Sequence, residues 1–219
     1  MVEQVNGATG GLSVEGLPAW QLARRERIVV AGLQLLENQE YDRIQIRDVA
    51  QEAGVALGTL YRYFSSKEHL YAAVLLEWSA LGRAGERRSR RGSAERHLRS
   101  RIRGVITAFE RQPQFYKVHV LLQSSTDPNA KALLTDFAEA AQASLVQDFA
   151  VLGPGRAEDA ATMMWAIIHS MLTQAIYHGV AMSEVYRIAD GFLDLLAKDL
   201  HADAQPQEAS ITGSTTRRR

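Results

Sequence analysis

Residues 46–64 read IRDVAQEAGVALGTLYRYF, and this stretch decides the fold of the N-terminal region. The apolar residues of its first half recur every three or four positions, which is the period of a short helix buried on one face. They are Ile46, Val49, Ala50 and Ala53. Gly54 ends this period, because glycine readily adopts the positive φ found where helices stop. A second short helix is expected at residues 57–64, so the stretch predicts a helix-turn-helix.

The second of these helices has an outward face unlike that of an ordinary solvated helix. Leu60 and Phe64 are one turn apart and are expected to pack inward. The residues expected outside are Gly58, Thr59 and Arg62, with Tyr61 and Tyr63 on the flanks. Small, polar and aromatic side chains fit a DNA major groove, where they reach base edges and phosphates. A bundle whose aromatics merely pack is the alternative, but packing does not require such an outward face.

The string GTLYRYFSSKEHL, preceded by IRDVAQEAGV, resembles the signature of the TetR family of transcriptional repressors over residues 45–70. The resemblance implies DNA contacts at Arg47, Leu57, Gly58, Thr59, Tyr61, Arg62, Tyr63 and Lys67. The sequence departs from the family pattern at Gln45 and Ala56, where a side chain often caps a helix, so both caps are expected to be missing. The same stretch is similar to actinobacterial sterol-catabolism repressors.

The family resemblance also implies how such a protein works. A homodimer would place two recognition helices one turn of DNA apart on a palindromic operator. A divergent C-terminal domain would hold a small, largely apolar effector, for which a steroid or an acyl-CoA derivative is expected. Binding of that effector would favour the wrong half-site spacing and release the operator.

The rest of the chain is expected to be all-α, because nearly every segment has a helical period and none has a sustained strand alternation. Pro113, Pro128, Pro154 and Gly179 separate the later helices, and Ser65 with Glu68 has the spacing of a capping box. The predicted organisation is a disordered tail at 1–19, a helix-turn-helix domain at 20–66, a ligand-binding and dimerisation domain at 67–201, and a disordered tail at 202–219.

Several polar and aromatic side chains lie on otherwise apolar helices of the C-terminal region. A small-molecule pocket is typically apolar with a few polar groups, so these residues are candidates for effector binding. They are Trp78, Tyr116, His119, Gln123, Trp165, His169 and Thr173. Taken singly, each is equally consistent with a hydrogen-bonded core residue.

The last two helices are candidates for a dimer interface. Residues 157–179 are apolar nearly all round, so this helix must be covered on more than one side. The final helix, at about residues 183–201, carries a second apolar face. Four such helices from two chains would cover both, although the core of a monomer would look similar in sequence.

Composition excludes other classes. The chain has no cysteine, no HExxH motif and no pair of histidines four residues apart, so neither a metal nor another cofactor is expected. An enzyme, such as a hydrolase or lyase, would need a catalytic motif that the sequence lacks, and a purely architectural DNA binder would leave two thirds of the chain without a role. With no signal peptide and no long apolar run, a cytoplasmic protein without a membrane partner is expected.

Charge is balanced, with 25 basic and 25 acidic residues, so DNA binding cannot rest on a general excess of positive charge. Arginines are nevertheless dense at residues 83–91 and at 217–219. A solvated loop and a solvated end are the simpler interpretation of these runs, because cations are favoured at a helix C-terminus. A second nucleic-acid contact remains the alternative.

Overall fold

The computed structural model describes residues 17–86 and 94–200, and within these ranges the chain is built of α-helices and two short 3₁₀ turns, without a strand. The all-α prediction is confirmed. The expected tail at 202–219 and residues 87–91 of the arginine-dense segment lie outside the described residues. So does the expected tail at 1–19, except for residues 17–19. The helices are α1 (Ala19–Asn38), α2 (Ile46–Glu52), α3 (Leu57–Tyr63), α4 (Lys67–Glu86), α5 (Ala94–Arg111), α6 (Pro113–Leu122), α7 (Pro128–Asp148), α8 (Pro154–His178) and α9 (Met182–Leu200).

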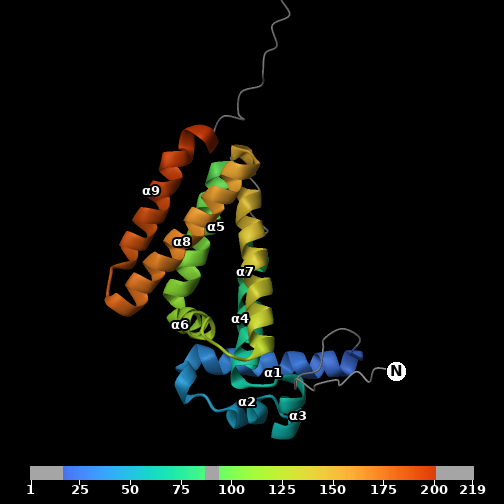
Figure 1. Ribbon diagram of the computed structural model, residues 1–219. Helices are drawn as coiled ribbons and strands as arrows, with labels where there is room; N and C mark the ends of the chain where they lie inside the picture. Colours follow the sequence, from blue (N-terminus) through green and yellow to red (C-terminus); the bar gives the residue numbers. More distant parts are fainter. Residues whose placement is uncertain (1–16, 87–93, 201–219) are drawn as a thin grey trace, which may run out of the picture.

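The first three helices lie together at one end of the molecule, and α4 rises from them beside α7 (Figure 1). Their core is formed by fully buried apolar residues such as Ile28, Val49 and Leu60, and it continues into Leu70 of α4. Gly32 of α1 lies where α4 crosses, and a Cβ there would be 2.9 Å from a Val74 methyl group. Burial of this shared core fixes α4 firmly to the helix-turn-helix.

A second core joins α5, α7, α8 and α9, with α9 on the outside of the bundle (Figure 1). Met164, Leu172 and Leu193 are fully buried in it. One predicted bound shifts, because α8 begins at Pro154 rather than 157. Before it, α7 ends at Asp148 and a separate 3₁₀ turn covers Ala150–Leu152. Proline is favoured in the first turn of a helix, which accounts for the earlier start of α8.

The start of α4 differs from its prediction. The helix begins at Lys67, and the Ser66 hydroxyl, not that of Ser65, accepts the hydrogen bond from His69 N at 3.0 Å. The predicted capping box of Ser65 and Glu68 is therefore wrong. Ser65 is used elsewhere, because its hydroxyl donates to Asp127 Oδ2 at 2.9 Å, and Asp127 caps α7. This contact joins the start of α4 to the start of α7.

The two caps that were expected to be missing have different outcomes. At the start of α2, Gln45 and Asp48 form a capping box, in which Asp48 Oδ2 accepts a hydrogen bond from Gln45 N at 3.3 Å, so this helix start is capped although Gln45 departs from the family pattern. At the start of α3, Ala56 gives no side-chain cap, as predicted.

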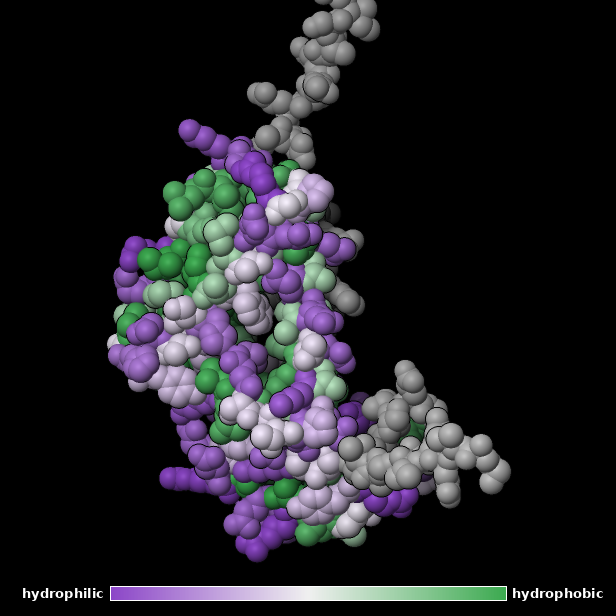
Figure 2. Space-filling model, viewed as in Figure 1, coloured by the Kyte–Doolittle hydropathy of each residue, from purple (hydrophilic) through white to green (hydrophobic). Residues whose placement is uncertain are grey.

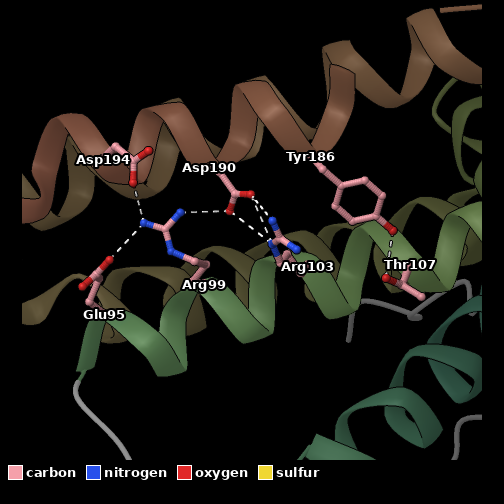
Figure 3. A network of polar contacts seen from close by, with 7 residues as sticks. All are labelled: Glu95, Arg99, Arg103, Thr107, Tyr186, Asp190 and Asp194. Carbon is pink, nitrogen blue, oxygen red and sulfur yellow. Dashed lines mark hydrogen bonds and ion pairs between the residues drawn. The ribbon is translucent and has the colours of Figure 1, made fainter. Parts of the chain in front are cut away.

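A network of ion pairs fastens α5 to α9 (Figure 3). Arg99 donates to Glu95 at 2.9 Å, to Asp190 at 3.1 Å and to Asp194 at 2.6 Å. Arg103 also donates to Asp190, and one turn further along α5 the Thr107 hydroxyl lies 2.8 Å from the Tyr186 hydroxyl. Since α5 also lines the internal cavity described below, the network holds one cavity wall against α9.

Candidate nucleic-acid interface and internal cavity

The outward face of α3 largely matches its prediction. Leu60 and Phe64 are fully buried, while Gly58, Tyr61 and Arg62 are exposed. Leu57 is exposed as well, and Thr59 is half-buried.

Tyr63 departs from this pattern, since it is only 3% exposed. The prediction that it flanks the outward face is wrong, because the residue three positions after the inward Leu60 lies on the same side of the helix.

The turn before α3 is made by Gly54, whose φ of +64° is the left-handed conformation predicted for it. Ala53 closes α2, and Val55 N donates back to Ala50 O at 2.9 Å. The chain can therefore change direction within two residues and place α3 across α2. Nothing lies within 4 Å of the position that a Cβ on Gly58 would take, so this part of α3 is open to a close partner.

The two predicted basic contacts differ in how free they are. The Arg47 side chain is 72% exposed, and its Nε is 3.7 Å from Asp48. Lys67, in contrast, donates from Nζ to Tyr41 O at 2.6 Å and lies 3.9 Å from the centre of the Tyr41 ring. Burial lowers the pKa of Lys67 against the opposing effect of nearby Asp42. The Lys67 ammonium group is thus already engaged in contacts with Tyr41.

An internal cavity of about 740 Å³ lies between α1, α4, α5, α6, α7 and α8. Its volume is in the usual range for small-molecule sites. The lining residues of α5 run from Arg101 to Arg111, which at the rise of a helix spans about 15 Å, so the cavity is elongated. Most of its wall is apolar, as at Leu75, Val105 and Ile168. Such a space favours a long, apolar molecule.

The structure brings the predicted effector residues together at this cavity. Trp78, Tyr116, His119, Trp165 and His169 line it. Gln123 and Thr173 do not line it, but each supports a residue that does. Gln123 Nε2 donates to the two histidines, and the Thr173 hydroxyl lies 2.8 Å from the Tyr116 hydroxyl.

Sequence reasoning missed two polar residues of the cavity wall, Gln112 and Glu37. Gln112 immediately precedes Pro113, between α5 and α6, and Glu37 lies in the last turn of α1. Their polar character did not predict this position. They lie at the cavity because α1 approaches the junction of α5 and α6.

Two hydrogen-bonding side chains of the cavity wall, His119 and Tyr116, are uncharged near neutral pH. Burial, and secondarily nearby His169, lower the pKa of His119 to about 4. Burial raises the pKa of Tyr116, although its hydrogen bond with Thr173 opposes that shift. Near neutral pH both groups are therefore neutral hydrogen-bonding groups.

In the part of the chain that the structure describes, no group of three or more histidine, cysteine or acidic side chains is placed to hold a metal ion. None of the helices between residues 17 and 200, outside the 87–93 gap, is long and apolar enough to cross a membrane.

Comparison with known proteins gives a family match and related chains. The family described as "Bacterial regulatory proteins, tetR family" matches residues 28–74. The HTH-type transcriptional repressor KstR of Rhodococcus jostii is 38% identical over 94 residues, which are 42% of this chain and 44% of that protein. KstR of Mycobacterium tuberculosis is 29% identical over 184 residues, 83% of this chain and 71% of that protein. The first alignment thus spans less than half of its relative.

Solved structures agree in fold. A TetR transcriptional regulator from Rhodococcus sp. RHA1 superposes with a TM-score of 0.68 at 23% identity, covering 81% of this chain and 97% of that one. The transcriptional regulator FadR from Bacillus subtilis, solved in complex with stearoyl-CoA, superposes with a TM-score of 0.59 at 17% identity, covering 80% and 98%. At these identities the likeness concerns the arrangement of the helices.

Proposed function

Since the chain belongs to the TetR family of bacterial transcriptional regulators, we propose that it is a repressor that binds a palindromic operator as a homodimer and is released by a small, largely apolar effector. The related proteins are regulators and not enzymes, and the same holds for this chain. The observation that carries the proposal is the pairing of an exposed recognition helix with an apolar cavity in one short chain.

The DNA contact is assigned to the exposed side of α3. Arg62 and Thr59 have the donors and acceptors that read base edges, and Gly58 permits close approach of the helix to the groove. Tyr61 and Arg47 lie at the margins, where a hydroxyl and a guanidinium can bind phosphate. Because charge in this region is balanced, specificity rests on the fit of α3 and on its duplication in a dimer.

The DNA-binding test uses the purified chain and a labelled fragment from the promoter beside its own gene, with a scrambled fragment of equal length as control. Specific binding at physiological salt is expected, with a cost of about 1–3 kcal/mol for Arg62→Ala. Arg187→Ala is the matched control, since this exposed arginine of α9 pairs only with Glu184 in the described part of the chain. Equal affinity for both fragments would contradict the proposal.

The effector is assigned to the internal cavity. Its length and apolar wall suit a steroid or the acyl part of an acyl-CoA derivative. The fold is shared with FadR of Bacillus subtilis, whose structure holds stearoyl-CoA, and the resemblance of the recognition helix to sterol-catabolism repressors favours the same classes. Mass spectrometry of ligand extracted from the purified protein tests this assignment. An effector found in this way should lower operator affinity when it is added back.

The homodimer is assigned to α8 and α9. Leu195 of α9 is 83% exposed, Met163 of α8 is 48% exposed and Tyr177 of α8 is 46% exposed, which is unusual for large apolar side chains on a monomer surface. Figure 2 shows hydrophobic side chains gathered over the α9 side of the molecule.

Light scattering after gel filtration tests the interface. A dimer is expected, and Leu195→Glu should dissociate it, because a charge would be buried without a partner. Leu121→Glu is the matched control, since Leu121 is an exposed leucine of α6. A monomer at all concentrations would contradict this assignment.

A further inference from the structure

Two histidines from different helices meet at the cavity wall. His119 of α6 and His169 of α8 have ring centres 5.9 Å apart, and both rings line the cavity. Gln123 holds the pair, because its Nε2 donates to His119 Nε2 at 3.2 Å and to His169 Nε2 at 3.1 Å. The two imidazoles are therefore fixed relative to each other by one amide group.

This arrangement determines where the imidazole protons are. A ring nitrogen that accepts a hydrogen bond carries no proton, so Nδ1 is the ring nitrogen that is left as an N–H donor in each histidine. Neither Nδ1 has a hydrogen-bond partner in the described part of the chain. Since both histidines line the cavity, its wall includes two N–H donors that have no partner among the described residues.

Nearby polar groups do not supply a positive charge. The Tyr116 hydroxyl already donates to His169 O at 2.7 Å. The described cavity-lining cations are Arg101 and Arg111, and no hydrogen bond joins either of them to the two histidines in the described part of the chain. Arg101 is paired with Asp148 at 2.6 Å. A carboxylate placed against the histidines would lose its hydration without gaining a cation, which is costly in an apolar space.

We propose that His119 and His169 donate hydrogen bonds to an uncharged carbonyl or hydroxyl oxygen of the effector, and that a free carboxylate is rejected at this position. The proposal rests on the assignment of the cavity as the effector site and adds the chemistry of one contact. It narrows the ligand class to elongated apolar molecules that bear a neutral oxygen acceptor along the part inside the cavity.

The test uses tryptophan fluorescence of the full chain. Trp20→Phe leaves Trp78 and Trp165, both of which line the cavity. This protein is titrated at neutral pH with 2-dodecanone, dodecanoate and dodecane, three probes of equal chain length. We expect the ketone to bind about tenfold more tightly than dodecanoate, because only the ketone satisfies the two donors without burying a charge.

Substitutions assign the difference to the histidines. His119→Phe and His169→Phe keep an aromatic ring but remove the donors, and each should weaken ketone binding by about fivefold while leaving dodecane binding unchanged. His178→Phe is the control, since His178 is an exposed histidine of α8 away from the cavity. Because His169 is only half-buried, its variant tests the proposal even where His119→Phe impairs folding.

Two outcomes separate this inference from the proposed function. Equal affinity for ketone and carboxylate, or ketone binding that ignores both substitutions, overturns the inference and leaves the cavity as effector site. Ketone binding that depends on the histidines but never alters operator affinity upholds the inference and contradicts effector release.

Discussion

The indole Nε1 of Trp78 donates a hydrogen bond to Gln112 Oε1 at 2.6 Å, and Gln112 Nε2 donates in turn to Glu37 Oε1 at 3.2 Å. All three side chains line the cavity. They come from α4, from the residue before α6, and from α1, which packs against α2 of the helix-turn-helix. These hydrogen bonds therefore join the cavity wall directly to α1 at the DNA-binding end. A bound molecule that moves Trp78 would disturb its hydrogen bond with Gln112, and through Gln112 the hydrogen bond to Glu37 of α1.

Gln112→Ala should weaken the coupling between cavity and operator. We expect the variant to bind DNA in the absence of effector, while the loss of operator affinity caused by an effector becomes several times smaller than in the unchanged protein. The quantity to compare is the ratio of operator dissociation constants with and without effector. Gln142→Ala is the control, because Gln142 donates to Thr162 at the surface. A ratio unchanged by Gln112→Ala would show that coupling takes another route.

Arg47→Ala and Lys67→Ala should have different effects on DNA binding. Arg47 is exposed, so its removal should reduce the slope of log affinity against log salt by about 1. The Lys67 ammonium is held by Tyr41, so Lys67→Ala should lower the melting temperature and leave the salt slope nearly unchanged. Anisotropy titrations at several salt concentrations measure the slopes. Equal slopes for the two variants would count against this division of roles.

The helix-turn-helix could be predicted from the sequence because its signals are local. Gly54 marks the turn, and the spacing of Leu60 and Phe64 sets the inward side of α3. The prediction for Tyr63 fails within the same helix, because a residue three positions after Leu60 lies close to the inward side and is buried. Aromatic hydroxyls suit phosphate contacts, but helix geometry decides exposure.

The connections between the two ends of the molecule could not be predicted. Ser65 and Asp127 are 62 residues apart, and Gln112 and Glu37 are 75 residues apart. Each pair forms because α4, α6 and α7 pack against the first core. The periodic pattern of apolar residues does not predict which distant side chains then come into contact. Apolar helices with scattered polar residues indicated a cavity, whereas the particular partners depended on tertiary packing.

Asp190→Asn should loosen the attachment of α5 to α9. Asp190 accepts hydrogen bonds from both Arg99 and Arg103 and is largely shielded from solvent. We expect a loss of about 1 kcal/mol in the free energy of unfolding, because partly exposed ion pairs contribute modestly even in a network. Urea unfolding at low and high salt measures it, with a smaller difference expected at high salt. Glu184→Gln, which affects an exposed pair within α9, is the control and should change stability less.

The buried His119 predicts how stability depends on pH. Its pKa falls from 6.5 to about 4 on folding, mainly through burial and secondarily through nearby His169. Between these values the unfolded chain binds a proton that the folded chain does not, so stability falls as the pH is lowered through this window.

For His119 this loss amounts to on the order of 3 kcal/mol. His119→Phe cannot bind that proton, so its unfolding free energy should fall less steeply between pH 6.5 and 4 than that of the unchanged protein. Denaturant unfolding at fixed protein concentration across this range measures both profiles. His178→Phe should retain the steeper profile, because that histidine is exposed. Parallel profiles for His119→Phe and the unchanged protein would mean that His119 becomes protonated in the folded state, which would contradict its assignment as a neutral group of the cavity wall.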